Sequence, residues 1–290
     1  MLFVQLLVNG LQIGALYALI AAGFSLIFGM TRIFHAAHGA TFTIAGFVFF
    51  QFYAVLDFSW PIAALMSVLA AGLFGVLLDK WVYAVIQRHE GSFFTVFVAS
   101  FGAAIVVQNI ISIVFGRGMV TVSTPLSKSI EIFPGLFIAP ISGAILVCAV
   151  ISFAILQWLL TRTNLGIALR ALGENPALVE VYGLTPQRLS QYVFLIGSVL
   201  VVPAAILTAS TSGLNPAMGN HVMLISIAAT IVGGVGSLRG AALAGLLLGL
   251  AENLCLAFID PQWSEAVTFA ILFFFILFRP GGVFGRVTVS

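Results

Sequence analysis

The chain has 290 residues, of which 61% are hydrophobic and only 7% are charged, with a formal net charge of +2. Because a water-soluble domain carries about 25% charged residues, this composition excludes a soluble globular protein. The small, scattered charge offers no basic surface for nucleic acid, and the two cysteines, Cys148 and Cys255, imply neither a disulfide framework nor a metal site.

Long apolar segments without strand-like alternation predict helices that span a membrane, since each span needs about 20 apolar residues. We expect an all-α, polytopic transmembrane bundle that forms a single domain over residues 1–290. The expected spans cover 4–29, 38–55, 61–84, 93–115, 138–160, 188–211, 217–234, 240–258 and 264–279. The second and seventh are short and flanked by glycine, so the count is eight or nine.

The basic residues predict the orientation of the bundle. Of the 11 lysines and arginines, all but Arg117 and Lys128 fall in one set of connecting segments. That set consists of Arg32, Lys80, Arg88, Arg162, Arg170, Arg188, Arg239, Arg279 and Arg286. Because basic loops stay in the cytoplasm, we expect the N-terminus outside and the C-terminus inside.

The longest run that is too polar for lipid extends from Thr161 to Arg188, in a cytoplasmic connection. Cap residues predict two short helices: one begins at Thr163 or Asn164, and the next is capped by Asn175 and ends at Gly183. The apolar face of the second helix consists of Leu178, Val181 and Tyr182. Because so short a helix needs a surface to pack against, it lies either on lipid headgroups or in a groove of a soluble partner.

Polar and glycine residues that interrupt the apolar spans are candidates for a translocation pathway. They are Asn9, Gln12 and Tyr17 in the first span, and His35, His38 and Gly39 where the second begins. A broken helix at this depth is tolerated beside a cavity, although hydrogen bonding between helices is the alternative role for each polar residue. Two histidines without a carboxylate or cysteine nearby do not indicate a metal site.

The glycine-rich segment from Gly233 to Ala241 superficially resembles a phosphate-binding loop. It lacks the Gly-Lys-Ser/Thr ending and follows a membrane helix, not a strand, which argues against nucleotide binding. We predict a tight cytoplasmic turn formed by Gly233, Gly234, Gly236, Ser237 and Gly240.

Small residues recur every four positions in two spans. Gly10 and Gly14 lie in the first span, and Ala241, Gly245 and Gly249 lie in the eighth. Such patterns let helix backbones approach closely, so both segments are predicted to pack tightly against other helices.

Two other classes of protein remain as alternatives. No unpaired charge lies clearly in the middle of a span, and a proton- or sodium-coupled carrier usually keeps one there. This argues against a self-contained carrier or channel for a small polar solute such as urea. An intramembrane enzyme would need a nucleophile with its base, or a metal set, within the spans, and His35 with His38 is the best pair available.

Three segments together resemble a known family. NGLQIGALYALIAAGFSLIFGMTRIFHAAHGA, LGIALRALGENPALVEVYGL and IVGGVGSLRGAALAGLLLGLAE, in this order, are similar to the permease of branched-chain amino acid ABC transporters. The resemblance covers nearly the whole chain. It implies the fold of an ABC importer permease in the bacterial inner membrane and no cofactor bound to the permease itself. It also implies a second related permease, two cytoplasmic ATPase subunits that use ATP, and a periplasmic solute-binding protein.

The resemblance further implies that the segment 161–188 contains the coupling helix that docks on the ATPases. The matching positions are Arg170, Ala171, Glu174, Asn175 and Gly183. One departure concerns the cargo. Where the family usually reads Asn-Phe-Ala-His-Gly-Glu, His35 and Ala40 stand in place of the first and last residues. The expected cargo is therefore a branched-chain amino acid or a related small amino acid or amide.

Overall fold

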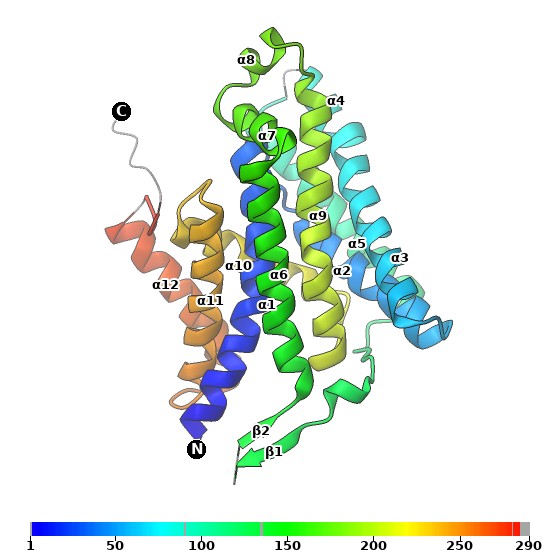
Figure 1. Ribbon diagram of the computed structural model, residues 1–290, viewed down its shortest axis with the longest axis vertical. Helices are drawn as coiled ribbons and strands as arrows, with labels where there is room; N and C mark the ends of the chain where they lie inside the picture. Colours follow the sequence, from blue (N-terminus) through cyan, green and yellow to red (C-terminus); the bar gives the residue numbers. More distant parts are fainter. Residues whose placement is uncertain (1, 90, 134–135, 280, 285–290) are drawn as a thin grey trace.

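The protein is a bundle of long helices in the computed structural model, which describes residues 2–89, 91–133, 136–279 and 281–284 (Figure 1). Within these residues, eight helices are long and apolar enough to cross a membrane, and a shorter apolar helix accompanies them. The predicted helical membrane fold with eight or nine spans is therefore confirmed. Arg286, which the orientation argument used, lies outside the described residues.

The first half of the chain contains α1 (Leu2–Thr31), α2 (His38–Phe50), α3 (Trp60–Leu78), α4 (Ala84–Arg88) and α5 (Phe93–Phe115). Two π-helical turns, Gln51–Val55 and Asp79–Tyr83, extend α2 and join α3 to α4. An antiparallel hairpin of β1 (Ile130–Phe133) and β2 (Leu136–Ile138) follows. The second half contains α6 (Pro140–Arg162), α7 (Asn164–Glu174), α8 (Pro176–Val181), α9 (Pro186–Thr211), α10 (Met218–Gly233), α11 (Leu238–Cys255) and α12 (Ser264–Phe278).

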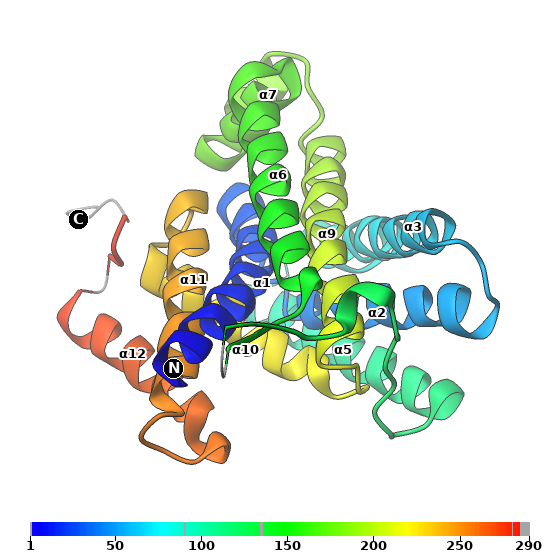
Figure 2. The ribbon, with the colours of Figure 1, turned by 60° about the horizontal axis from the view of Figure 1, so that its bottom comes forward.

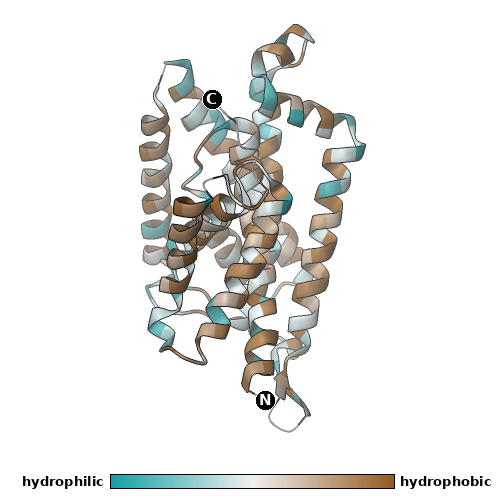
Figure 3. Ribbon diagram, turned by 90° about the vertical axis from the view of Figure 1, so that its left-hand side faces the viewer, coloured by the Kyte–Doolittle hydropathy of each residue, from teal (hydrophilic) through white to brown (hydrophobic). Residues whose placement is uncertain are grey.

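The two ends of the bundle differ in what they carry. The start of α1 and the β-hairpin lie at one end, and α7 and α8 lie at the other (Figure 1). Hydrophilic residues gather toward these two ends, and the helices between them are mostly hydrophobic (Figure 3). Helix α1 runs through the middle of the bundle, with α12 at one edge and α3 at the opposite edge (Figure 2).

Helices α1 and α11 pack with their backbones in contact. A methyl group on Gly14 would lie 2.6 Å from the carbonyl oxygen of Leu246, and one on Gly245 would lie 2.8 Å from the backbone nitrogen of Ala18. Gly249 approaches the backbone of Gly14 in the same way. The small-residue patterns in the two spans therefore face each other, as close packing predicts.

Helices α2 and α10 both begin inside the bundle. Their first turns meet where Gly39 contacts Gly219, and a methyl group on Gly219 would lie 2.7 Å from the carbonyl oxygen of Gly39. From this point α2 runs toward the end with the β-hairpin, and α10 runs toward the end with α7 and α8 (Figure 1). These are the second and seventh expected spans, which are short because they begin inside the bundle.

The chain reverses just before each of these helices, and other segments hydrogen-bond the irregular backbone. The backbone nitrogen of Ala37 donates to the Ser100 hydroxyl at 2.9 Å. Before α10, the backbones of Leu214 and Val120 exchange two hydrogen bonds, of 2.7 and 2.9 Å. Irregular backbone at membrane depth is stable only when protein groups satisfy it in this way.

Replacing Gly249 by valine should destabilise the bundle by about 1–3 kcal/mol, because the added side chain would overlap the backbone of Gly14. Thermal unfolding of the purified protein in detergent measures the loss. The control is Gly143→Val in α6, where a methyl group meets no atom within 4 Å. Equal melting temperatures for the two variants would contradict the packing described here.

Candidate functional site

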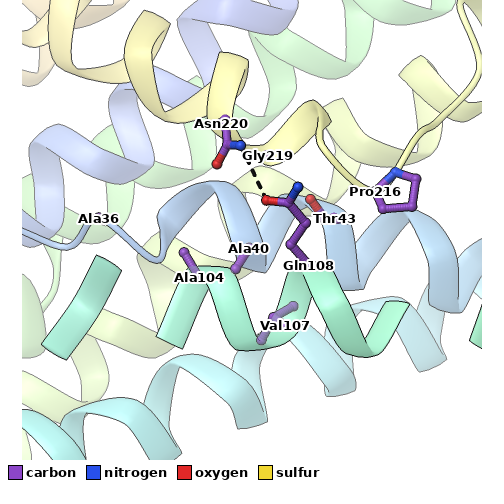
Figure 4. Close-up of a pocket in the computed structure, with 9 residues that line it drawn as sticks. All are labelled: Ala36, Ala40, Thr43, Ala104, Val107, Gln108, Pro216, Gly219 and Asn220. Carbon is purple, nitrogen blue, oxygen red and sulfur yellow. Dashed lines mark hydrogen bonds between the residues drawn. The ribbon is translucent and has the colours of Figure 1, made fainter. Parts of the chain in front are cut away.

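Polar side chains reach the surface of the bundle on both sides of the first turns of α10. Asn220 projects outward from α10, and Gln108 and Asn109 lie on the neighbouring helix α5. The Asn220 side-chain amide donates a hydrogen bond of 3.2 Å to the side-chain oxygen Oε1 of Gln108 (Figure 4). Because α5 is otherwise apolar and spans the bundle, these amides form a polar patch in a hydrophobic surface.

A small cavity lies behind the Gln108–Asn220 hydrogen bond. Ala36 and Ala40 at the start of α2, together with Ala104 and Val107 of α5, form an apolar wall (Figure 4). The remaining lining residues are Thr43, Gln108, Pro216, Gly219 and Asn220. This cavity, called the inner cavity below, lies against the first turns of α2 and α10. The side-chain amides of Gln108 and Asn220 lie at its rim.

A second cavity, of about 270 Å³, adjoins the first on the side of the β-hairpin. It is polar: its lining residues are Gln108, Asn109, Ser112, Arg117, Asn215, Pro216 and Ala217. Gln108 and Pro216 line both cavities, so the Gln108–Asn220 hydrogen bond stands between them. The second cavity can accept a small molecule whose groups hydrogen-bond to amides, whereas the first, of about 10 Å³, has room for about one water molecule.

Tyr17 lies on the other flank of α10, in a cluster that the sequence analysis did not assemble. Its hydroxyl is 3.0 Å from the His221 ring, and the other ring nitrogen of His221 is 2.9 Å from a carboxylate oxygen of Glu265. Glu252 of α11 lies beside Tyr17 and is 8% exposed. Glu252 lies in the last turn of α11, and its carboxylate is enclosed in the bundle. Its sequence signal was its place on the face of Gly245 and Gly249, which packs against α1.

The two other polar candidates of α1 make hydrogen bonds elsewhere in the bundle. The carbonyl oxygen of the Gln12 side chain accepts a 2.6 Å hydrogen bond from Ser142 of α6, and Asn9 accepts one of 3.0 Å from Gln5. Neither residue lines the two cavities above. Their observed contacts are hydrogen bonds within and between helices, and a role in the pathway stays a prediction for both.

His35 and His38 are fully buried at the reversal between α1 and α2. The Nδ1 atom of His35 is 2.8 Å from the Tyr83 hydroxyl, which is 2.7 Å from the Ser100 hydroxyl. His38 contacts the carbonyl oxygen of Ile20 at 3.0 Å. These contacts hold the reversal in place, and neither ring reaches the cavities described above. A pathway role for the two histidines stays a prediction.

Gly39 lies between the histidines and the cavity, with its backbone against Gly219. Any side chain at Gly39 would overlap the Gly219 carbonyl group. A substitution at Gly39 would therefore separate α2 from α10 whether or not the pathway passes beside it. No cluster of three or more metal-ligating side chains is found in the described part of the chain.

The segment between α6 and α9 protrudes from the bundle as α7 and α8 (Figure 1). Its helix caps are those predicted: the Thr163 hydroxyl accepts from the backbone nitrogen of Gly166 at 3.0 Å, and the Asn175 side chain accepts from that of Leu178 at 3.1 Å. Gly183, with φ of +77°, ends the second helix in the left-handed conformation that glycine favours.

The other residues predicted to act in this segment lie on α7, and α8 forms an apolar tip. Arg170 and Glu174 are exposed and Ala171 is half-buried on α7. Val181 and Tyr182 are 81% and 77% exposed, and Leu178 is 51% exposed. Leu178 and Tyr182 also line an apolar groove of about 310 Å³ with Ala171. The tip thus presents large apolar side chains beyond the bundle.

The glycine-rich segment after α10 forms a tight turn into α11. Gly234 and Gly236 have φ of +102° and +81°, and the Ser237 hydroxyl caps α11 by accepting from the backbone nitrogen of Gly240 at 3.1 Å. Gly233 and Gly240 touch through their backbones. The segment has the geometry of a helix connection.

Residues 6–276 match the family described as branched-chain amino acid transport system / permease component. The chain belongs to this family. The permease is 27% identical to the high-affinity branched-chain amino acid transport system permease protein LivH of Salmonella typhimurium (strain LT2), over 99% of this chain and 97% of that protein. It is 28% identical to the corresponding permease BraD of Pseudomonas aeruginosa, with the same coverage.

Its fold resembles that of PsaBC from Streptococcus pneumoniae, solved in complex with Fab. The TM-score is 0.52 and the sequence identity 9%, over 96% of this chain and 92% of that chain. This similarity concerns the fold alone. The family membership makes the protein a transport permease and not an enzyme, and it does not favour the self-contained carrier.

Replacing Tyr83 by phenylalanine should destabilise the permease by about 1–3 kcal/mol, because it leaves buried polar atoms of His35 and Ser100 without a partner. Thermal unfolding in detergent measures the effect. Tyr192→Phe, at an exposed position of α9, is the matched control and should melt like the wild type. An unchanged melting temperature for the Tyr83 variant would show that this network does not hold the reversal.

Proposed function

We propose that this permease lines one half of a pathway for small amino acids, and that a second, related permease completes the pathway over the polar face around α10. The observation that carries the proposal is the set of polar side chains exposed there in an apolar surface, namely Asn109, Asn220 and Glu265. A charged or amide group facing hydrocarbon costs about 1–3 kcal/mol or more. A second protein surface and the water of a pathway remove this cost, whereas lipid does not.

The apolar tip of α8 supports docking on a soluble partner. Val181 and Tyr182 project from the bundle beyond α7, at the end where the helices connect through basic segments. Large exposed apolar side chains on such a protrusion are typical of a contact surface. Two cytoplasmic ATPase subunits that hydrolyse ATP, one on each permease, are the proposed partners. Arg170 and Glu174 would lie at the edge of this contact. The turn at Gly183 would transmit movement of the ATPases from α8 to α9.

The basic connecting segments also support the proposed orientation of the permease in the membrane. The end of α1, the link from α4 to α5, the α7–α8 segment and the start of α11 all lie at one end, which we place in the cytoplasm. The start of α1 and the β-hairpin then face the outside of a bacterial inner membrane. A periplasmic solute-binding protein would deliver cargo at that end, over the polar cavity around Asn215 and Arg117.

The cavities support an amino acid with an aliphatic side chain as the cargo. The relatives LivH and BraD are named for branched-chain amino acids. Ala36, Ala40 and Val107 give the inner cavity an apolar wall beneath two amides. This apolar wall favours contact with an aliphatic group, which urea lacks, once the cavity widens from its volume of about 10 Å³.

Co-purification in mild detergent tests the assembly. The tagged wild type should carry a second permease and two ATPase subunits. Val181→Asp should reduce the recovered ATPases about tenfold or more, because a charge enters an apolar contact, while the second permease is retained. Glu180→Gln, on the same helix outside the apolar face, should behave like the wild type. If the wild type elutes alone from a host that expresses its neighbours, α8 is a surface helix and the self-contained carrier is favoured instead.

Cysteine protection tests the second permease. In a variant in which Cys148 and Cys255 are replaced by alanine, Asn109→Cys should react with a membrane-impermeant maleimide in the isolated permease and react several-fold more slowly in the complex. Met119→Cys, on the exposed outer loop, should react equally in both. Equal rates for Asn109→Cys in both states would place the second permease on another face.

A further inference from the structure

A compact group of titratable side chains lies between four helices on the flank of α10 that faces α12. It consists of Tyr17 of α1, His221 of α10, Glu252 of α11 and Glu265 of α12. His221 bridges the Tyr17 hydroxyl, at 3.0 Å, and the Glu265 carboxylate, at 2.9 Å. Glu252 faces the Tyr17 hydroxyl and interacts electrostatically with His221 and Glu265. We call these four residues the acidic cluster.

The acidic cluster is short of positive charge. The Oε2 atom of Glu252 is buried and has no hydrogen-bond partner. The contact of His221 with Glu265 is an ion pair when His221 is protonated, and no described lysine or arginine is in contact with it. With both carboxylates ionised, at least one negative charge stays unbalanced whether or not His221 is protonated. Binding of a cation therefore stabilises a buried carboxylate in this state.

The geometry suits an organic ammonium group. The three N–H donors of a primary ammonium match three acceptors present here, namely the free Glu252 oxygen, the Glu265 carboxylate and the Tyr17 hydroxyl. The Glu252 oxygen is enclosed, so its side chain must rotate to meet the ligand. The rings of Tyr17 and His221, with centroids 6.0 Å apart, lie beside the carboxylates, and an aromatic face attracts a cation. The His221 side chain is 27% exposed, so the acidic cluster reaches the surface on this flank of α10.

We propose that the acidic cluster binds the ammonium group of an amino acid as it passes through the permease. This inference rests on the proposed function, and it adds a subsite to the apolar cavity on the other flank of α10. The Glu252 carboxylate carries the interaction, Glu265 and Tyr17 complete it, and His221 positions the Glu265 carboxylate and the Tyr17 hydroxyl. The subsite selects molecules that have an ammonium group over carboxylic acids of the same shape.

Saturation-transfer NMR on the complex of permeases and ATPases in lipid nanodiscs, without binding protein, tests the subsite with three probes at millimolar concentration. Leucine and 3-methylbutylamine have the ammonium group, and 4-methylpentanoate has the same apolar chain without it. The first two should receive saturation from the protein and the third should not. Glu252→Gln should weaken both bound probes about tenfold or more, because it removes a charge-assisted hydrogen bond.

Asp260→Asn, which removes an acidic charge from the outer loop beside α12, is the matched control and should bind as the wild type does. Glu265→Gln, at a position 57% exposed, repeats the test if Glu252→Gln does not fold. Unchanged affinity in both glutamine variants, or equal binding of 4-methylpentanoate, overturns the proposal. So does loss of the second permease from Glu252→Gln on purification, since the missing cation would then be a partner side chain.

Leucine uptake by vesicles that contain the whole wild-type importer separates this inference from the proposed function. If the vesicles take up leucine but 3-methylbutylamine does not bind to the nanodisc complex, the ammonium subsite is overturned and the proposed function stands. Amine binding without leucine uptake overturns the proposed cargo and leaves the subsite as a site for other ammonium compounds.

Discussion

The structure depends on one constraint: backbone that leaves a helix inside a membrane must be hydrogen-bonded by protein. The chain breaks this way twice, before α2 and before α10, and both breaks are enclosed by other helices. Ser100 satisfies the first and the Val120 backbone satisfies the second. The two helices that start there meet through Gly39 and Gly219, so their first turns lie in the interior and bring polar groups to that depth.

This arrangement sorts the polar residues of the membrane region into two kinds. His35 and Ser100 are enclosed and keep the reversal of the chain in place, where no cavity reaches them. Asn220 and His221, on the first turns of α10, reach the surface or a cavity, where their side chains adjoin other polar groups. The shortness of α10 links fold and function, because a full-length helix would place these two residues near the membrane boundary.

Local signals made much of the fold predictable. Apolar length located the spans, and cap residues such as Asn175 located the helices of the protruding segment. The site was less predictable because a polar residue in an apolar span looks the same whether enclosed or exposed. The environment of His35 depends on Tyr83, 48 positions away, and His221 gains its role from Glu265 on another helix. Such pairings depend on tertiary packing, which one sequence without its fold does not reveal.

The glycine contacts between helices also determine how mutational data on this protein should be interpreted. Every substitution of a glycine adds at least one carbon atom, so Gly39, Gly219 and Gly249 have no conservative replacement. In a complete mutational scan these positions will be as intolerant as any residue that touches the cargo. Intolerance to substitution alone will therefore not distinguish glycines in backbone contacts from residues that line the pathway. At Asn220 and Glu265, whose side chains are exposed, a loss of transport without a loss of folded protein or of the proposed second permease can be read as a statement about the cargo.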